Sequence, residues 1–242
     1  MIHITPLDLL IGIFLVFVTP VWGLWDFHTL RRAVARGEPE ARVRSYRQGI
    51  LMAWVVTGVV VAVWLTAGRG VSTLGIRPPG SWPWTLVGLG VVGLLLVQLQ
   101  GVRRSPETRR HLREAAGELE PFLPRTSREQ RWFAALGVTA GVTEELLWRG
   151  ALMAALGVFT GPWLAAVGSS VAFGLAHVYQ GPVGVVRSGV IGMALAALYL
   201  ASGSLLAPIV VHAAIDVVNG RMAALALRDA EAPVQAAPAL CR

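Results

Sequence analysis

The sequence has little charge, a single cysteine and no lysine, and these shortages exclude several classes of protein. Only 14% of its 242 residues are charged while 55% are hydrophobic, and the mean hydropathy is +0.60. A soluble domain of this length needs far less apolar sequence. The one cysteine, Cys241, excludes a disulfide framework within the chain. The composition therefore predicts an integral membrane protein with one membrane domain.

The net charge of +7 does not indicate a nucleic-acid-binding protein, because the basic residues form no binding stripe. Every basic residue is an arginine, and most arginines fall in two segments between apolar runs, at 31–47 and 103–131. This concentration is typical of loops that remain in the cytoplasm. We therefore expect the surrounding partner to be a lipid bilayer and not a nucleic acid.

Apolar runs of about 20 residues are long enough to cross the roughly 30 Å hydrocarbon core of a bilayer as helices. Seven such runs can be marked by the glycine, proline and charged residues at their ends. They are Leu7–Trp25, Gly49–Ala67, Trp84–Gly101, Trp132–Leu156, Pro162–Gln180, Val183–Ala201 and Leu205–Asn219. The predicted fold class is therefore all-α, a polytopic transmembrane helical bundle of about seven spans.

The distribution of arginine also predicts the topology and the organisation of the chain. If both arginine-rich segments are cytoplasmic, the N-terminus lies outside and the C-terminus inside.

We divide the chain into N-terminal transmembrane helices with an interfacial loop helix (1–124), a core (125–219) and a mobile C-terminal tail rich in alanine and proline (220–242).

The loop at 103–131 is expected to contain the interfacial helix, because four apolar residues form a stripe among its charges. These residues are Leu112, Leu119, Phe122 and Leu123. Near the end of the loop, Thr126 or Ser127 can cap a helix, with Glu129 in its first turn. This pattern predicts the start of the fourth span.

A few ionisable side chains fall inside the predicted spans, where each costs a few kcal/mol if it faces lipid. They are Glu144, Glu145, Arg149, His177, Arg187, His212 and Asp216. Glu145 and Arg149 are four residues apart and can pair on one helix face, whereas Glu144 points about 100° away. Arg187 lies near the end of its span and is expected to be a snorkelling anchor.

The depths of these groups can be compared by counting residues from the ends of the spans. At about 1.5 Å of rise per residue, Glu144, His177 and His212 fall within roughly 10 Å of one another in depth. We therefore expect three antiparallel helices to converge on one site in the inner half of the bilayer.

The same residues form three motifs, EELLWR at 144–149, FGLAH at 173–177 and HAAID at 212–216. They resemble the motifs EExxxR, FxxxH and Hxxx(N/D) of the CAAX protease and bacteriocin-processing family, the Rce1-like or Abi intramembrane proteases. The order and intervals of the motifs also fit, over about 125–219, so the resemblance implies an Rce1-like catalytic core. Asp216 stands where eukaryotic members have asparagine, and an ionised carboxylate accepts a hydrogen bond without donating one.

The resemblance implies an intramembrane endopeptidase that acts on a peptide or membrane-protein substrate. Glu144 and His177 would hold and deprotonate the attacking water, while His212 and Asp216 would stabilise the oxyanion. The remaining motif residues are Glu145, which we include in the catalytic set, and Arg149 and Phe173, to which we assign structural roles. Glu145 and Arg149 are expected to hold the helix and tune Glu144, and Phe173 is expected to pack beside His177.

A metal could also bind at this site, since Glu144, His177 and His212 with an open position form a hydrolytic zinc set. The sequence has no HExxH motif, and the resemblance admits both a metalloprotease and a metal-independent glutamate protease. We favour water activation without a metal, so we predict no cofactor, with a divalent ion such as zinc as the alternative.

Two other function classes are compatible with buried charges in a helical bundle. An ion-coupled transporter would use them as a relay and would show repeated halves, which this sequence lacks. A non-enzymatic immunity or scaffold protein would tolerate loss of a motif residue, whereas all are present.

The absence of lysine beside many arginines indicates a GC-rich bacterial genome and hence a bacterial cytoplasmic membrane. The sequence carries no signature of oligomeric state.

Overall fold

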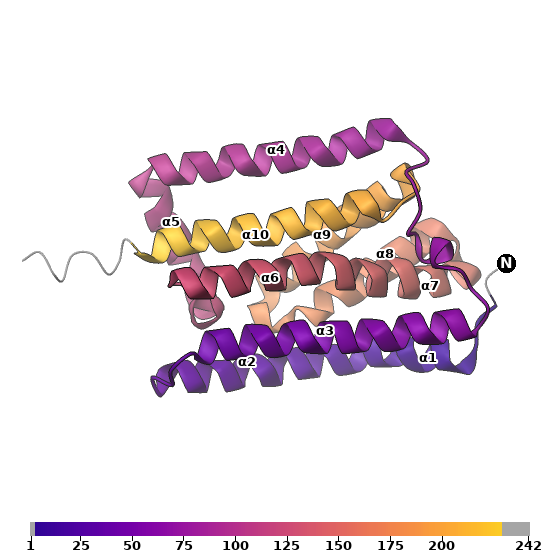
Figure 1. Ribbon diagram of the computed structural model, residues 1–242, viewed down its shortest axis with the longest axis horizontal. Helices are drawn as coiled ribbons and strands as arrows, with labels where there is room; N and C mark the ends of the chain where they lie inside the picture. Colours follow the sequence, from indigo (N-terminus) through magenta and orange to yellow (C-terminus); the bar gives the residue numbers. More distant parts are fainter. Residues whose placement is uncertain (1–2, 229–242) are drawn as a thin grey trace, which may run out of the picture.

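Helices form all the regular structure in residues 3–228, the part of the chain that the computed structural model describes (Figure 1). The elements in order are α1 (Pro6–Ile13), η1 (Phe14–Val18), α2 (Thr19–Ala35), α3 (Ala41–Thr66), η2 (Val71–Leu74), α4 (Trp82–Arg104), α5 (Pro106–Ala116), η3 (Gly117–Phe122), α6 (Ser127–Glu144), η4 (Glu145–Leu152), α7 (Met153–Thr160), α8 (Pro162–Ala176), η5 (Val178–Gln180), α9 (Gly181–Ser202) and α10 (Leu206–Arg228). The predicted all-α class is confirmed.

Five helical segments of the described chain are long and apolar enough to cross a membrane. They are Pro6–Ala35, Ala41–Thr66, Trp82–Arg104, Val178–Ser202 and Leu206–Arg228. The other two predicted spans differ from these. Helix α8 has 15 residues and is about 22 Å long, while the continuous helix formed by α6, η4 and α7 carries three charged motif residues near its middle. The count of seven is therefore approximate, and the two exceptions are helices that carry the motifs.

The long helices lie side by side along the longest axis of the molecule, with the N-terminus at one end (Figure 1). The α2–α3 turn, the α4–α5 corner and the last turn of α10 lie together at the opposite end. This end contains both arginine-rich segments, so both can face the same side of a bilayer. Which side that is stays a prediction.

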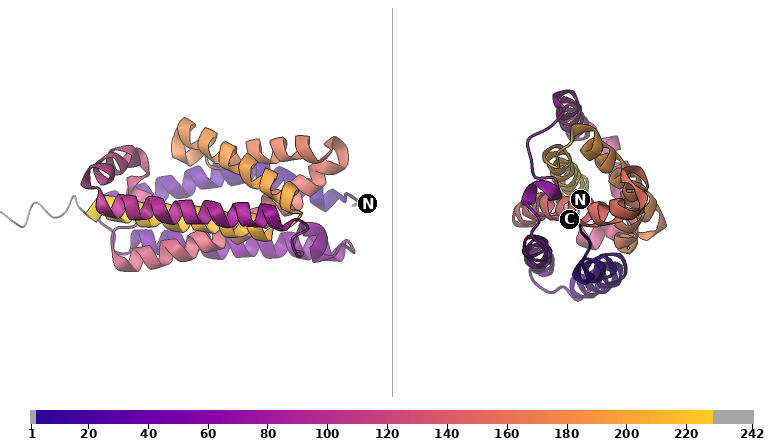
Figure 2. Two further views of the ribbon diagram at one scale, coloured as in Figure 1. Left: turned by 90° about the horizontal axis from the view of Figure 1, so that it is seen from above. Right: turned by 90° about the vertical axis from the view of Figure 1, so that its right-hand side faces the viewer.

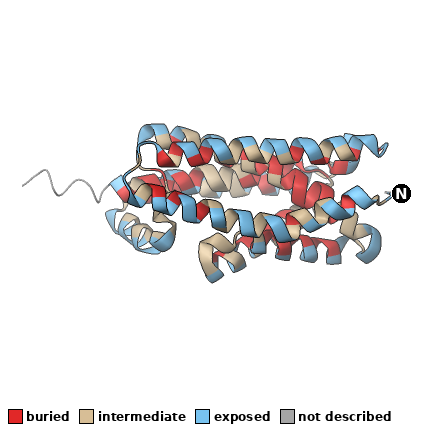
Figure 3. Ribbon diagram, turned by 90° about the horizontal axis from the view of Figure 1, so that it is seen from below, coloured by how far each residue is buried: buried red, intermediate tan, exposed pale blue. Residues whose placement is uncertain are grey.

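Burial follows the pattern of a bundle surrounded by lipid. Large apolar side chains are exposed on the outer faces of the helices, for example Phe17 (66%), Leu94 (70%) and Phe159 (71%). Buried residues gather on the inner faces (Figure 3). An apolar outer surface of this extent is typical of contact with a membrane, in agreement with the predicted class.

The most extensive helix contact in the described chain, between α6 and α10, depends on two glycines spaced as GxxxG. A Cβ atom at Gly137 would lie 2.9 Å from the Cβ of Asp216, and one at Gly141 would lie 2.7 Å from the Cβ of Ala213. Only glycine permits this approach of the two backbones. Because Glu144 follows Gly141 by three residues, the same approach brings it toward His212.

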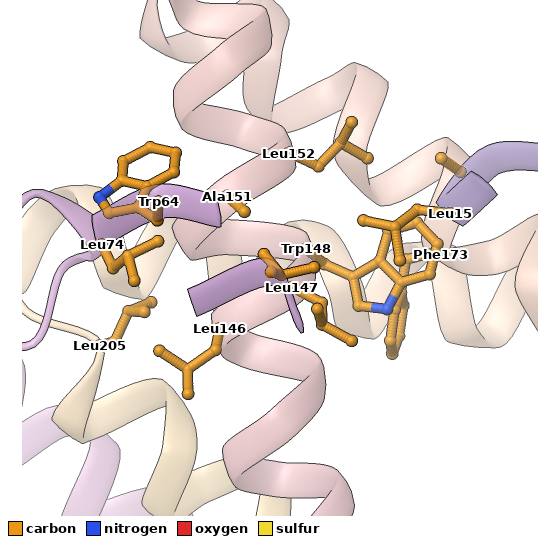
Figure 4. Close-up of a cluster of buried hydrophobic side chains, with 12 residues drawn as sticks. Leu15, Trp64, Leu74, Leu146, Leu147, Trp148, Ala151, Leu152, Phe173 and Leu205 are labelled. Carbon is orange, nitrogen blue, oxygen red and sulfur yellow. The ribbon is translucent and has the colours of Figure 1, made fainter. Parts of the chain in front are cut away.

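The main hydrophobic core lies around the helix that carries the first motif (Figure 4). Its buried members come from several elements: Leu15, Val60, Trp64, Leu74, Leu146, Leu147, Trp148, Ala151, Leu152, Ala172, Phe173 and Leu205. The apolar residues between and after the motif charges therefore anchor this helix in the core, while its charged residues face other neighbours.

The predicted helix in the loop at 103–131 is present as α5, and the stripe residues continue into η3. Gly117, the first residue of η3, has a positive φ of 48°, which ends α5 at Ala116. Helix α6 then begins with Thr126 as its N-cap and Glu129 in a capping box, which confirms the start predicted for the fourth span.

The prediction that a mobile tail begins at 220 is wrong for residues 220–228, because α10 continues to Arg228. Gly220 packs so closely on Phe133 that a Cβ atom would lie 2.4 Å from its ring. Val218 and Met222 are buried against Leu99 and Val102 of α4. These contacts hold the helix beyond the core, and the rest of the predicted tail lies outside the described residues.

Candidate active site

Four of the predicted site residues line one cavity of about 470 Å³. Glu144 lies at the end of α6, His177 directly after α8, and His212 and Asp216 one turn apart on α10. The structure thus brings together the residues that the depth argument expected to converge. Their catalytic roles stay predictions.

The α8–α9 hairpin is short, which positions His177. Its turn, at η5, ends before the arginine-rich end of the neighbouring helices (Figure 2, left). His177 and the following residues Tyr179 and Gln180 therefore reach the cavity from the tip of a hairpin. A helix that crossed the whole bundle would instead carry this motif past Glu144.

The cavity side chains are close to one another but not directly hydrogen-bonded. The Nε2 atom of His212 lies 3.8 Å from Oε2 of Glu144 and 3.8 Å from Oδ2 of Asp216, beyond ordinary hydrogen-bond length. Within residues 3–228, the buried Oε2 atom of Glu144 has no hydrogen-bond partner. Separations of this size leave space for a bridging water.

Glu144 and Glu145 face different surroundings, as their positions on the helix predicted. The Glu144 side chain is 28% exposed and lines the cavity, whereas the Glu145 side chain is fully buried. The predicted pairing of Glu145 with Arg149 is present, since Nη1 of Arg149 donates to Oε1 of Glu145 at 2.8 Å.

Glu145 also binds His212, which the sequence reasoning missed. The Nδ1–H group of His212 donates to the same Oε1 atom at 2.7 Å. Because Nδ1 is used as a donor, the neutral ring presents Nε2 as an acceptor, and the ring can donate from Nε2 only if it carries both protons. Glu145 therefore orients His212 in addition to pairing with Arg149. The two residues are 67 positions apart, so no local spacing could indicate this contact.

His177 has a similar arrangement with a different partner. Its Nδ1–H group donates to the main-chain oxygen of Phe173 at 2.8 Å. In the neutral ring Nε2 is then an acceptor. The first and last residues of the FxxxH motif are thus joined by a hydrogen bond that sets the orientation of the imidazole.

The ring of Phe173 packs beside His177, as predicted, and also contacts other motif residues. Its centroid lies 4.6 Å from that of His177 and 5.9 Å from that of His212. The guanidinium carbon of Arg149 lies 4.4 Å from the ring centroid, in a cation–π contact. Gly192 of α9 makes room for both, because a Cβ atom there would lie 3.0 Å from each side chain. Phe173 therefore joins all three motifs.

The helix that carries Glu145 and Arg149 is widened into a π-helix, η4, over Glu145–Leu152. Segments of this kind are frequent at functional sites, and no sequence pattern predicted it here. Ser169 of α8 donates to the main-chain oxygen of Trp148 at 2.6 Å. Gly150 lies against η2, where a Cβ atom would come within 2.9 Å of the Leu74 oxygen. The sequence TEELLWRG thus combines cavity, core and loop contacts in one segment.

Several polar residues outside the motifs also line the cavity: Asp26, Tyr179, Gln180, Arg187 and Asn219. Arg187, the predicted snorkelling anchor, also lies on this wall, where its Nη2 donates to Oε1 of Gln180 at 3.4 Å. Asp26 was overlooked because the predicted first span ended at Trp25, whereas the helix continues to Ala35.

The apolar stripe of the arginine-rich loop forms another wall of the cavity. Its members Leu112, Leu119, Phe122 and Leu123 all line it. Helix α3 holds this segment through Tyr46, whose hydroxyl donates to the Phe122 oxygen at 2.5 Å. The stripe that predicted an interfacial helix therefore faces the cavity.

The metal alternative has limited geometric support. In the described part of the chain, no three His, Cys, Asp or Glu side chains are arranged to hold a metal ion. Glu144, His177 and His212 do line the same cavity, and both histidines keep Nε2 available. Histidines oriented through Nδ1–H suit a metal ligand as well as a proton acceptor, so the absence of a cofactor stays a prediction.

A comparison with protein families matches residues 129–218 to Rce1-like, described as type II CAAX prenyl endopeptidase Rce1-like. The matched segment runs from the first turn of α6 into α10 and contains all three motifs. No curated protein and no solved structure gives a significant match to the chain.

Proposed function

We propose that this chain, in which residues 129–218 match the Rce1-like family, is an intramembrane endopeptidase that uses a water activated by Glu144 and His177. The observation that carries the proposal is the convergence of Glu144, His177 and His212, from three separate helices, on one cavity. Peptide hydrolysis needs an activated water, oxyanion stabilisation and a proton for the leaving amine. Each need can be assigned to a side chain on the cavity wall.

Glu144 is the proposed general base. Its side chain is 28% exposed and lines the cavity, so its carboxylate can accept a proton from a water there. His177, oriented by its bond to the Phe173 oxygen, accepts a second hydrogen bond from that water through Nε2. The water attacks the scissile carbonyl, and Glu144 then passes the proton to the leaving amine.

His212 is the proposed oxyanion donor. Donation from Nε2 requires the doubly protonated ring, because Nδ1–H already donates to Glu145. The Glu145 carboxylate then balances the positive charge of the imidazolium. Asp216, with Oδ2 3.8 Å from the same Nε2 atom, helps to position the ring or the substrate. In this proposal Glu145 acts through His212, while Arg149 and Phe173 hold both in place.

The proposed substrate is a peptide or membrane protein, and the proposed location is the bacterial cytoplasmic membrane with the C-terminus in the cytoplasm. The composition, the arginine-rich end of the bundle and the apolar cavity wall contributed by α5 and η3 support this assignment. The oligomeric state has no bearing on this mechanism, since one chain supplies every motif residue.

A comparison of wild type with Glu144→Gln tests the activity. Gln keeps the shape of the side chain but cannot accept the proton, so turnover should fall by about 10² to 10⁴. Mass spectrometry of cellular peptides and membrane proteins from the two strains should reveal fragments present only with wild type, and the purified proteins should reproduce those cuts. Thermal melts in detergent control for folding. Identical peptide profiles and equal cleavage by the two purified proteins would contradict the proposal and favour a scaffold or transporter.

The absence of a catalytic metal is a separate part of the proposal. Purified active protein should hold no stoichiometric divalent ion, and its activity should survive prolonged chelation. A metal ligated by Glu144, His177 and His212 would supply a Lewis acid at the same cavity. One equivalent of zinc, with activity lost on chelation and restored by adding zinc, would overturn the metal-free mechanism and leave the protease assignment intact.

A further inference from the structure

Asp26 is a cavity residue that neither the motifs nor the proposed mechanism uses. It lies on α2, is half-buried, and lines the same cavity as Glu144 and His177. Within residues 3–228 it has no hydrogen bond or ion pair of its own. An unpaired carboxylate in a helix apolar enough to span a membrane is costly, and such residues commonly face a functional partner.

The residues on either side of Asp26 hold it close to the catalytic groups. Gly23, one turn earlier, contacts the hairpin tip so closely that a Cβ atom would lie 3.4 Å from the ring of Tyr179. Phe27 is buried, and its ring centroid lies 5.7 Å from that of Tyr179. Tyr179 in turn lies 5.9 Å from His177, centroid to centroid. Asp26 therefore belongs to a packed wall that contacts His177 through Tyr179.

The charge of the cavity favours a cation beside Asp26. Three carboxyl groups line it, those of Asp26, Glu144 and Asp216, whereas Arg187 is its only arginine or lysine among the described residues. Arg149 is already paired with Glu145 outside the cavity. A substrate group that enters near Asp26 is thus favoured if it is positive, since lysine and arginine donate charge-assisted hydrogen bonds to a carboxylate.

We propose that Asp26 is a specificity-determining residue that binds a lysine or arginine side chain of the substrate close to the scissile bond. The ring centroids of Phe27 and His177 lie 5.7 and 5.9 Å from that of Tyr179, which lies between them. Because an extended chain advances about 3.3 to 3.6 Å per residue, this side chain is expected within about four residues of the cut. The inference rests on the proposed function, because it names the substrate class of the same cavity.

Cleavage of a synthetic peptide library by the purified, detergent-solubilised protein tests the preference. Wild type should prefer peptides with lysine or arginine at one fixed position within about four residues of the scissile bond. For a lysine peptide taken from that set, Asp26→Asn should lower kcat/KM about tenfold, mainly through KM, because one charge-assisted bond is lost. A matched peptide with neutral norleucine in place of lysine should be cut equally by both proteins. Asp26→Lys should reverse the preference toward glutamate.

Arg187→Gln is the matched control, because it changes the other charged cavity residue outside the motifs and should preserve the lysine preference. Thermal melts of each variant control for folding. Cuts without a basic preference in wild type, or an unchanged lysine-to-norleucine ratio in Asp26→Asn, would show that Asp26 is only a hydrated surface carboxylate and would overturn the inference.

A binding measurement separates this inference from the proposed function. Fluorescence anisotropy with labelled library peptides in the Glu144→Gln background should show tighter binding of lysine peptides than of their norleucine counterparts. Adding Asp26→Asn should remove the difference. If wild type cuts no peptide at all, the proposed activity fails, while this binding ratio still decides whether Asp26 selects a cation. Equal binding of the two peptide types would overturn the inference.

Discussion

Two buried arginine–carboxylate pairs lie in the part of the bundle that the structure describes, and they differ in what else their atoms contact. Asp8 of α1 accepts two hydrogen bonds, 2.9 and 2.5 Å long, from Arg69, which follows α3. Arg69 also donates to the His3 oxygen at 2.8 Å and lies over the ring of Trp64. Asp8 in turn caps the start of α1 through Thr5. This pair joins distant parts of the chain at one end of the bundle.

The Glu145–Arg149 pair lies within one helix and has a single hydrogen bond between its members. Within the described residues, Oε2 of Glu145 and both Nε and Nη2 of Arg149 are buried without hydrogen-bond partners, whereas the first pair leaves one such atom, Nε of Arg69. The other Glu145 oxygen also holds His212. Incomplete pairing of buried polar atoms costs stability. We interpret the first pair as a structural link between distant parts of the chain. We interpret the second pair as orienting His212 in the candidate active site, at a cost in stability.

Breaking the Glu145–Arg149 pair should have the larger effect. Arg149→Ala leaves Glu145 charged at a fully buried position and removes the contact with Phe173, so it should destabilise the protein by about 3–5 kcal/mol. Activity should also fall, because Glu145 and Phe173 both contact His212. A thermal melt in detergent and cleavage per folded molecule measure the two effects.

The double variant Glu145→Gln with Arg149→Gln is the control for this prediction. It removes both charges while keeping polar side chains of similar shape, so it should be more stable than Arg149→Ala alone. A double variant that melts below the single variant would contradict the interpretation of a charge pair.

Weakening the Asp8–Arg69 pair should lower stability without changing the chemistry. Asp8→Asn keeps one oxygen that can accept from Arg69, so we expect a loss of about 1–3 kcal/mol, the cost of an imperfectly paired buried group. The kcat per folded molecule should match wild type, since neither residue lines the cavity. A melt and an activity titration on the same sample test this, and a fall in kcat at full folding would remove the distinction between the two pairs.

The smallest effect is expected at Asp216. If its role is hydrogen bonding near His212, Asp216→Asn should show near-normal activity, since the amide keeps an acceptor and adds a donor. A role that depends on the carboxylate charge would instead lower kcat strongly. Steady-state kinetics of the variant beside Glu144→Gln distinguish these outcomes, and a loss comparable to that of Glu144→Gln would show that Asp216 also acts through its charge.

Local patterns predicted the parts of the site that depend on one helix at a time. The spacing of Glu145 and Arg149, the different orientation of Glu144 and the N-cap at Thr126 all follow from the helical repeat, and the structure contains each of them. The same reasoning erred at helix ends. It ended the first span before Asp26 and the last before residue 220, because lipid-facing hydropathy does not report the packing that extends α2 and α10.

The amino-acid sequence by itself determined that this protein is a helical membrane protein with three polar motifs at compatible depths, because hydropathy and the 3.6-residue repeat depend only on residue order. Tertiary structure alone decided which polar groups meet. Examples are the hydrogen bond from His212 to Glu145, the cavity positions of Asp26 and Arg187, and the shortness of the α8–α9 hairpin. They depend on how closely helices approach, and that distance is set by steric contact at glycines such as Gly137 and Gly141.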